Sequence, residues 1–313
     1  MPAAIDPEKI LGELHQLWDQ LDSQTAGSGG ILRACAMTLA VVAQDEADAA
    51  QARRTIGVLM HDHPCRALVL KMHDGGELSA RVFAECWMPF GGQQQICSEG
   101  VEITAIPDHF AEVARLIAPL RAPDLPLVLW CRGPDAFSLR AFDYLFPEAD
   151  KLIFDSSAVS RAHSALSFLR MLRGRRHLVA DLAWTRLTAC RERLAHLFRE
   201  QELTSADVKS AHVAYSGLAP STEALYIASW IGLALPALHI RLERIEGDPG
   251  LRNVTLATNK GDLSLTFARG SQLEVRSCGQ GYRSSLPSSD EAELMREELK
   301  ILGRDPVFER VLG

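Results

Sequence analysis

The stretch LPLVLWCRGPDAF (Leu125–Phe137) decides the fold class. Its first half is an apolar run of strand length, and its second half is a turn that contains Gly133 and Pro134. A helix predicted over about 136–145 follows the turn, and the apolar run KLIFD (151–155) comes next as a second strand. A strand, a helix and a strand in this order are typical of a parallel sheet with helices on its faces.

The same alternation extends through the residues before this stretch. We predict strands in LRACAMTLAVVA (32–43), CRALVLKM (65–72), ELSARVFAECW (77–87) and QQICSEGVEITAI (94–106). We predict helices over EADAAQARRTIGVLMHDH (46–63) and over DHFAEVARLIAPL (108–120), the second capped by Asp108. An amphipathic helix over Ile10–Leu21 precedes them. We expect it to form an arm, residues 5–22, because the Gly- and Ser-rich connector SQTAGSGG (23–30) follows it.

The second half of the chain has a different pattern. Helices over 158–172 and 182–198, a strand over 208–215 and a helix over 221–233 precede four short alternating runs between 239 and 277. The joints between these runs carry Gly-Asp-Pro-Gly, Asn-Lys-Gly and Arg-Gly, which are hairpin signals, and a final helix is predicted over 290–302. The predicted fold is an N-terminal α/β sheet domain (1–157) and a C-terminal α+β domain (158–313) with a small antiparallel sheet.

Composition and charge exclude several classes of function. A chain of 313 residues exceeds the usual size of a single core, and its net charge of -7 argues against a nucleic-acid partner. The sequence lacks an apolar segment of membrane-spanning length and the features of a signal peptide, so we expect a cytoplasmic protein with no membrane partner. Seven cysteines without a CxxC pair are typical of a reducing compartment, where most would be buried thiols.

Candidate catalytic and metal-binding residues are few. Cys131, beside Arg132, would need a base and an orienting group to act as a nucleophile, and the alternative is a buried thiol at a strand end. The segment HDHPC (61–65) lacks the second pair of ligands that tetrahedral zinc usually requires. The glycine clusters at 27–30, 91–92 and 279–281 match neither a P-loop nor a GxGxxG motif. We therefore predict no metal and no cofactor.

The segment DLAWTRLTACRERLAHLF (181–198) places two notable residues outside its apolar stripe. Leu187 to Phe198 supply the stripe of one continuous helix, whereas Trp184 and Arg186 lie off it. Trp and Arg are enriched at binding hot spots. The alternative is a Trp184 buried between the domains, with Arg186 paired to a carboxylate such as Asp181 or Asp155.

A basic run ends the preceding predicted helix, and it comprises Arg170, Arg173, Arg175 and Arg176. Cations are stabilised at the carboxyl end of a helix by its dipole, so a solvated helix end is one interpretation. A site for a phosphate or an acidic partner is the other.

These segments resemble a known family. DLAWTRLTACRERLAHLF, with LPLVLWCRGPDAF, ADKLIFDSS (149–157) and PSTEALYIASWIGLAL (220–235), resembles the OpcA family of bacterial glucose-6-phosphate dehydrogenase assembly proteins. The resemblance covers most of the chain from about Leu32. It implies a non-catalytic assembly factor and allosteric activator that binds glucose-6-phosphate dehydrogenase, stabilises its active state and supports the oxidative pentose phosphate pathway. In some photosynthetic bacteria the family is linked to redox control, which is a hypothesis here because the sequence has no close cysteine pair.

We expect the partner-binding residues on the strand-end turn, on the helix and near the carboxyl terminus. They are Trp130 and Arg132, Trp184 and Arg186, and Arg304 and Asp305. Two other functions remain open. One is an enzyme, either a Cys131-dependent hydrolase or a transferase of a phosphorylated sugar, and the other is a regulator that binds a small phosphorylated metabolite near the basic run.

Overall fold

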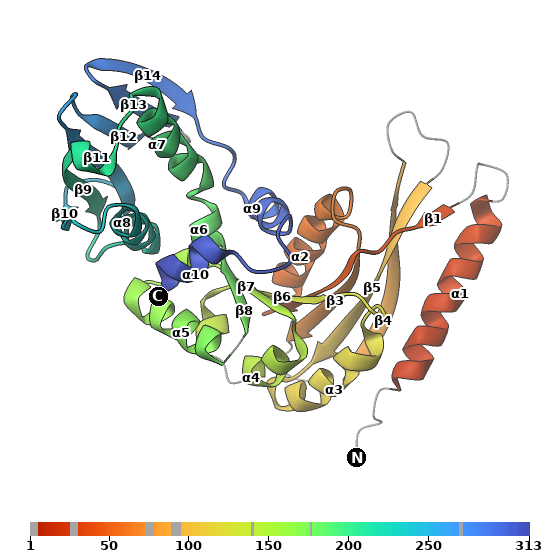
Figure 1. Cartoon of the computed structure of the whole chain (residues 1–313). Coiled ribbons are helices and arrows are strands. Elements are labelled where there is room, and N and C mark those ends of the chain that lie inside the picture. The colour runs from red at the N-terminus through yellow and green to blue at the C-terminus, as the bar shows by residue number, and fades with distance from the viewer. Residues whose placement is uncertain are drawn as a thin grey trace. The chain divides into compact units, whose positions relative to one another are not determined.

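The computed structural model describes residues 6–25, 31–72, 78–88, 95–138, 141–175, 177–268 and 272–313. The chain divides into two compact units (Figure 1). Unit 1 comprises Met1–Phe154 and His177–Val179, and unit 2 comprises Asp155–Arg176 and Ala180–Gly313.

Unit 1 is built on a largely parallel sheet in the order β1-β5-β3-β2-β6-β7-β8, with β4 added at β5. The strands are β1 (Ile31–Arg33), β2 (Met37–Ala43), β3 (Cys65–Met72), β4 (Ser79–Trp87), β5 (Gln95–Ala105), β6 (Leu127–Cys131), β7 (Lys151–Phe154) and β8 (Leu178–Asp181), of which β8 passes into unit 2 after Val179. Strands β4 and β5 pair antiparallel, whereas the pairs β1–β5, β2–β3, β2–β6, β3–β5 and β6–β7 are parallel. The run β5-β3-β2-β6-β7-β8 has the 3-2-1-4-5-6 order of the dinucleotide-binding fold. The predicted α/β sheet is confirmed.

The helices of unit 1 are α1 (Pro7–Thr25), α2 (Glu46–Leu59), α3 (Phe110–Leu120) and α4 (Ala141–Leu145). Figure 1 shows α2 on one face of the sheet, and α3 and α4 on the other. Helix α1 does not extend as an arm. Its residues Ile10, Leu14 and Trp18 are buried, and the helix packs against β4 and α3.

Some predicted boundaries in unit 1 differ from the structure. The strand expected over 32–43 is interrupted after Arg33 and becomes β1 and β2. The predicted cap at Asp108 is wrong, because α3 begins at Phe110 after a 3-10 turn, Pro107–His109. Two more 3-10 turns, Pro134–Phe137 and Phe146–Glu148, flank α4, which shortens the helix expected over 136–145.

Unit 2 contains a six-stranded sheet in the order β10-β9-β11-β12-β13-β14. Its strands are β9 (Val208–Ser216), β10 (Ile240–Arg244), β11 (Gly250–Thr258), β12 (Leu263–Ala268), β13 (Gln272–Ser277) and β14 (Gln280–Ser285). Its helices are α5 (Ala162–Gly174), α6 (Leu182–Thr185), α7 (Thr188–Glu200), α8 (Thr222–Ala234), α9 (Glu291–Glu298) and α10 (Pro306–Leu312), and 3-10 turns occupy Ser156–Ala158 and Ser205–Asp207.

The unit 2 sheet is mixed rather than antiparallel. Strand β10 pairs with β9 in parallel, while the other pairs are antiparallel. The predicted small antiparallel sheet is present in the other five strands, and the prediction is wrong for β10 alone, since α8 lies between β9 and β10 in the chain and parallel strands need such a crossover connection.

One face of this sheet forms the core of unit 2. Val213, Val254, Leu265 and Val275 are cross-strand neighbours in register, and all four are fully buried. Helices α7 and α8 pack on the sheet (Figure 1). Alternating apolar residues in β11, β12 and β13 thus explain both the strands and the side on which the helices lie.

Candidate functional site

Asp181 is the first residue of the segment DLAWTRLTACRERLAHLF. It ends β8 and caps α6, and its side chain is fully buried. One carboxylate oxygen accepts from the backbone amides of Ser156 (2.9 Å) and Ala183 (3.0 Å). The other accepts from the Tyr226 hydroxyl (2.7 Å) and from the Ser156 hydroxyl. Burial raises the pKa of Asp181 to about 6, although these hydrogen bonds favour its charged form.

Trp184 lies in an aromatic cluster inside unit 2. Its ring centroid is 5.9 Å from those of both Tyr226 and Phe308, and its indole nitrogen donates to Asp305 at 3.1 Å. The guanidinium carbon of Arg191 lies 3.5 Å from the centroid of the indole. Burial lowers the pKa of Arg191 to about 10, against the opposing effect of the Asp305 carboxylate. Trp184 is only 2% exposed, so the expected surface position of this side chain is wrong.

Arg186 occupies the break between α6 and α7. Its guanidinium contacts the carboxylates of Asp155 at 2.9 Å and Glu223 at 3.3 Å. Burial alone would lower the pKa of Arg186, but the two carboxylates raise it overall. The pairing of Arg186 with Asp155 agrees with the alternative interpretation of this motif.

Arg304 and Asp305 precede α10 and differ in their surroundings. Asp305 caps the helix by accepting from the amides of Val307 (2.9 Å) and Phe308 (3.0 Å), in addition to the Trp184 indole. The Arg304 side chain is 73% exposed and pairs with Glu309 at 3.2 Å. Arg304 is therefore well placed to contact another molecule, whereas Asp305 holds Trp184 and α10 together.

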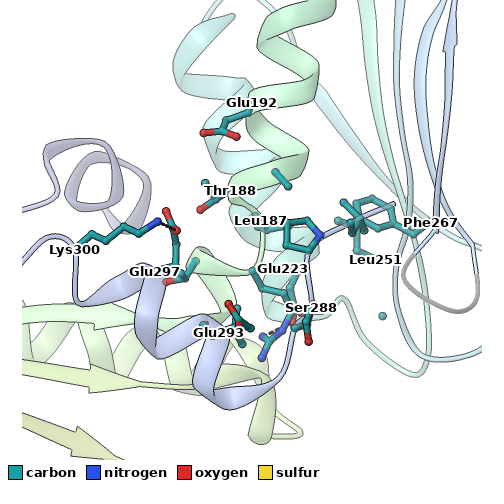
Figure 2. A pocket seen from close by; sticks show the side chains of 18 residues that line it. Leu187, Thr188, Glu192, Glu223, Leu251, Phe267, Ser288, Glu293, Glu297 and Lys300 are labelled. Carbon is teal, nitrogen blue, oxygen red and sulfur yellow. Dashed lines mark hydrogen bonds and ion pairs between the residues drawn. The ribbon is translucent and has the colours of Figure 1, made fainter. Parts of the chain in front are cut away.

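A pocket of about 520 Å³ adjoins the α6–α7 break (Figure 2). In Figure 2, Glu297 and Lys300 lie on one side of it, and Leu251 and Phe267 lie on the other. Its charged lining residues are Arg186, Glu192, Glu223, Glu293, Glu297 and Lys300. The carboxylates outnumber the cations, so the electrostatics of this pocket favour a cationic guest over a phosphate.

The basic run of α5 is partly engaged within unit 2. Arg170 donates to the carbonyl of Leu312, and Arg173 donates to that of Gly313. These bonds satisfy carbonyls at the end of α10, as cationic side chains near a helix carboxyl end commonly do. Arg176 lies outside the described residues.

Trp130, Cys131 and Arg132 lie together in unit 1. Trp130 is 1% exposed, so its expected surface position is wrong, and the Arg132 guanidinium carbon lies 5.0 Å from the centroid of its indole. Cys131 is buried, and burial raises the pKa of its thiol well above the usual value. Because a nucleophilic cysteine must be an accessible thiolate, the buried-thiol interpretation of Cys131 is confirmed.

The amino end of α2 carries two carboxylates that accept hydrogen bonds from backbone amides of the chain itself. In dinucleotide-binding folds the pyrophosphate binds at this position, the amino end of the helix after the first strand of the order. Here the Asp45 carboxylate accepts from the amide of Asp48 (2.8 Å), and the Asp48 carboxylate accepts from the amide of Gln44 (2.9 Å). Arg132 forms an ion pair with Asp48. Two carboxylates thus lie at the amino end of α2, and their negative charge disfavours a phosphate there.

Other sequence motifs have structural roles where the structure describes them. His61 of HDHPC contacts the Trp87 ring (4.9 Å between centroids), and Gly279 forms a turn with a φ of 86°. The clusters at 27–30 and 91–92 lie outside the described residues. Among the described residues, no three His, Cys, Asp or Glu side chains are grouped to hold a metal ion. Over the same part of the chain, no helix has the length and apolar character needed to cross a membrane.

The cysteines include one disulfide that the sequence spacing did not reveal. Cys86 in β4 lies directly opposite Cys97 in β5, with their Cα atoms 4.1 Å apart, and the two form a disulfide. The prediction that most of the seven cysteines are buried thiols is wrong, because only Cys65, Cys131 and Cys190 are buried and free, while Cys35 and Cys278 are partly exposed. The strand register, rather than proximity in sequence, brings the bonded pair together.

The chain is similar to known proteins over most of its length. The family model described as the glucose-6-phosphate dehydrogenase subunit N-terminal domain matches residues 57–171, and the model of the C-terminal domain matches 177–312. A protein of Synechocystis sp. is 29% identical over 147 residues, which cover 46% of this chain and 31% of that protein. A protein of Synechococcus elongatus is 25% identical over 206 residues, which cover 64% of this chain and 46% of that protein. Both bear the provisional name OxPP cycle protein OpcA. The chain spans less than half the length of these relatives.

Solved structures show a distant likeness. Biliverdin reductase from Synechocystis sp. gives a TM-score of 0.43 at 10% identity, over 88% of this chain and 94% of that chain. The super-repressor mutant of Gal80p from Saccharomyces cerevisiae gives 0.46 at 9% identity, over 84% and 86%. Because the TM-scores and identities are this low, these structures say nothing about the activity of this chain.

Proposed function

Because this chain belongs to the OpcA family of glucose-6-phosphate dehydrogenase subunits, we propose that it binds glucose-6-phosphate dehydrogenase and stabilises the active assembly of that enzyme. In physical terms, it binds one conformation or oligomeric state of the enzyme more tightly than the others, and this difference in affinity shifts the population. A coupling of about 1 to 3 kcal/mol changes substrate affinity or the active fraction by roughly 5- to 150-fold. The site of action is the cytoplasm, in support of the oxidative pentose phosphate pathway.

The acidic amino end of α2 is the observation that best supports a role without catalysis. Unit 1 has the strand order of a dinucleotide-binding fold, in which ligands bind beyond the carboxyl ends of the strands. At that place the chain has Asp45 and the Asp48–Arg132 ion pair instead of a phosphate cradle. Carboxylates at this place disfavour a dinucleotide phosphate and so count against hydride transfer.

Under this proposal, some of the predicted docking residues contact the enzyme, and the others hold the contacting elements in position. Arg304 and the exposed part of Arg186 contact the enzyme. Arg132 contributes to a lesser extent, because its side chain is only 11% exposed. Trp130, Trp184 and Asp305 are positioning residues, since the first two are buried and the third caps α10.

The test combines physical association with enzyme kinetics. The purified chain is mixed with the glucose-6-phosphate dehydrogenase of the same organism, and comigration on a sizing column and glucose-6-phosphate saturation are measured. We expect a stable complex and either a lower half-saturation concentration or a larger active fraction. A wild-type chain that neither comigrates nor changes the kinetics would refute the proposed function.

A charge-reversal variant tests the docking residues separately. Arg304→Glu should weaken the complex at least tenfold, because it reverses an exposed charge without touching the core of unit 2. The matched control is Arg283→Glu, which reverses another arginine that is 75% exposed and also paired with a carboxylate, that of Glu274. If both variants bind like the wild type, the assignment of Arg304 fails while the proposed function stands.

A further inference from the structure

A second hollow in unit 2 lies between α7 and α8, and we name it the α7–α8 groove. It has a volume of about 970 Å³, and Leu256 of β11 contributes to its lining. Its apolar walls come from the two helices and from the segments that follow them. They comprise Leu194, Phe198, Leu203, Trp230, Ile231 and Leu235.

Helix α8 is apolar on its groove side as well as on its core side. Ile227 and Ile231 are buried, yet Trp230 and Ala234 line the groove and Leu233 is 49% exposed. A helix that covers one face of a sheet normally presents polar residues outward. A half-buried indole in an apolar hollow at the surface is instead typical of a binding site.

The α7 side of the groove is cationic. Arg193 donates only to neutral hydroxyls, those of Tyr282 (3.4 Å) and Ser284 (3.2 Å), and Arg199 is exposed. Among the described residues, neither arginine forms an ion pair with a carboxylate of the chain. His196, also in the lining, pairs with Glu200, and Glu192, the residue before Arg193, is the acidic group of the α7 lining. Arg193 and Arg199 therefore keep donors for an acidic guest.

We infer that the α7–α8 groove binds an acidic amphipathic helix of the partner protein. Apolar residues of that helix at positions i, i+3, i+4 and i+7 would contact Phe198, Trp230 and Leu235. Arg199 lies six positions after Arg193, a rise of about 9 Å along the axis of α7. Carboxylates six or seven positions apart on the guest helix would therefore reach both guanidinium groups.

Charge also selects this class of guest over others. The whole chain carries a net charge of -7 and therefore repels acidic segments in general, whereas the groove side of α7 attracts them. A basic helix would face the two arginines, and the single carboxylate of a fatty acid would reach only one of them. The inference rests on the proposed function for the identity of the partner, but binding of an acidic helix is measurable without the enzyme.

The first test uses a labelled synthetic peptide and the full chain. The peptide carries Leu at helical i, i+3, i+4 and i+7 spacing with Glu on the flanking positions, and a scrambled peptide of the same composition is the control. Fluorescence anisotropy should show a dissociation constant on the order of 1 to 100 μM for the patterned peptide. The scrambled peptide should bind at least tenfold more weakly. The affinity of the patterned peptide should fall as the salt concentration rises. Equal affinity of the two peptides, or no binding of either, would overturn the inference.

Variants locate the binding. Arg199→Glu should weaken binding of the patterned peptide at least tenfold, while Arg283→Glu on β14 should leave it unchanged. The Arg199 side chain is exposed, so its substitution is not expected to affect folding, and a thermal unfolding curve verifies this for each variant. If oleate displaces the peptide and binds wild type and Arg199→Glu alike, the groove is an acyl-chain site and the inference is wrong.

Comigration with the dehydrogenase then distinguishes the proposed function from the groove inference. If wild type and Arg199→Glu comigrate with the enzyme equally well, the proposed function stands and the groove inference falls. If the patterned peptide binds in the groove while wild type fails to comigrate, the groove inference stands and the partner has been assigned wrongly.

Discussion

At the residue scale, Asp181 shows how burial sets the charge of a carboxyl group. Its four hydrogen-bond donors are neutral groups of Ser156, Ala183 and Tyr226, and burial raises its pKa from 3.8 to about 6. The folded chain therefore binds this proton more tightly than the unfolded chain does. The contribution of Asp181 to stability is largest below about pH 4 and is lost as the pH rises to about 6.

Replacing Asp181 by Asn removes this pH dependence. The amide oxygen of Asn keeps the two backbone donors, and its NH₂ group faces the hydroxyls of Ser156 and Tyr226, which can rotate to accept. Between pH 4 and 7, we expect the stability of the wild type to fall by up to about 3 kcal/mol relative to Asp181→Asn. Urea unfolding of both proteins across this range measures the difference. A constant difference would show that Asp181 does not titrate there.

Trp184 gives a second prediction at this scale. Trp184→Ala should destabilise the chain by about 3 to 5 kcal/mol, because it leaves a cavity between Tyr226 and Phe308. Trp184→Phe keeps a ring and loses mainly the hydrogen bond to Asp305, so it should cost much less. Denaturant unfolding compares the two. An alanine variant within about 1 kcal/mol of the wild type would contradict the burial described here.

Trp184 also shows why the sequence was misleading about side-chain exposure. The prediction assumed one continuous helix over 182–198, and on that helix Trp184 and Arg186 lie outside the apolar stripe. The structure ends α6 at Thr185 and begins α7 at Thr188, so the two residues follow a different helical phase. The same break hides the contact of Arg191 with Trp184, because sequence spacing carries no information across an interruption.

At the element scale, the disulfide between β4 and β5 links an edge strand to the sheet. Cys86 and Cys97 are 11 residues apart in sequence, and closing a loop of this length in the unfolded chain corresponds to about 3 kcal/mol in the chain-entropy model. We expect a reductant to lower the free energy of unfolding of the wild type by up to this amount. Cys86→Ser should already be weakened and should no longer respond to the reductant.

The control for this experiment is Cys278→Ser, which removes a free, partly exposed cysteine of unit 2. It should respond to the reductant as the wild type does. Equal stability of wild type and Cys86→Ser under non-reducing conditions would show that the disulfide does not form in solution or does not stabilise the fold.

Elements with strong patterns were predictable, and short or polar ones were not. CRALVLKM was predicted as a strand with the bounds that β3 has, because eight largely apolar residues end at clear turn signals. Strand β8 has only four residues, and β14 has the sequence QGYRSS with no apolar alternation, so neither was predicted. Strand β14 forms through backbone pairing with β13, which does not require apolar side chains.

At the scale of the whole molecule, the proposed function requires reciprocity. If this chain raises the affinity of the dehydrogenase for glucose-6-phosphate by a given factor, then glucose-6-phosphate must tighten the complex by the same factor. The dissociation constant of the complex, measured with and without saturating substrate, checks this. A typical coupling predicts a change of roughly 5- to 150-fold. Substrate affinity that changes while the affinity of the complex does not would exclude this mechanism.

The sequence by itself determined the α/β class of the first half, most strands with clear patterns, and the resemblance that the family models bear out. These properties depend on local periodicity and on segments that can be recognised separately. Only the tertiary structure decided that Trp130 and Trp184 are buried, that Asp48 pairs with Arg132 at the amino end of α2, and that Cys86 meets Cys97. The physical reason is that strand register, helix breaks and packing bring together residues far apart in sequence, and no local pattern records these contacts.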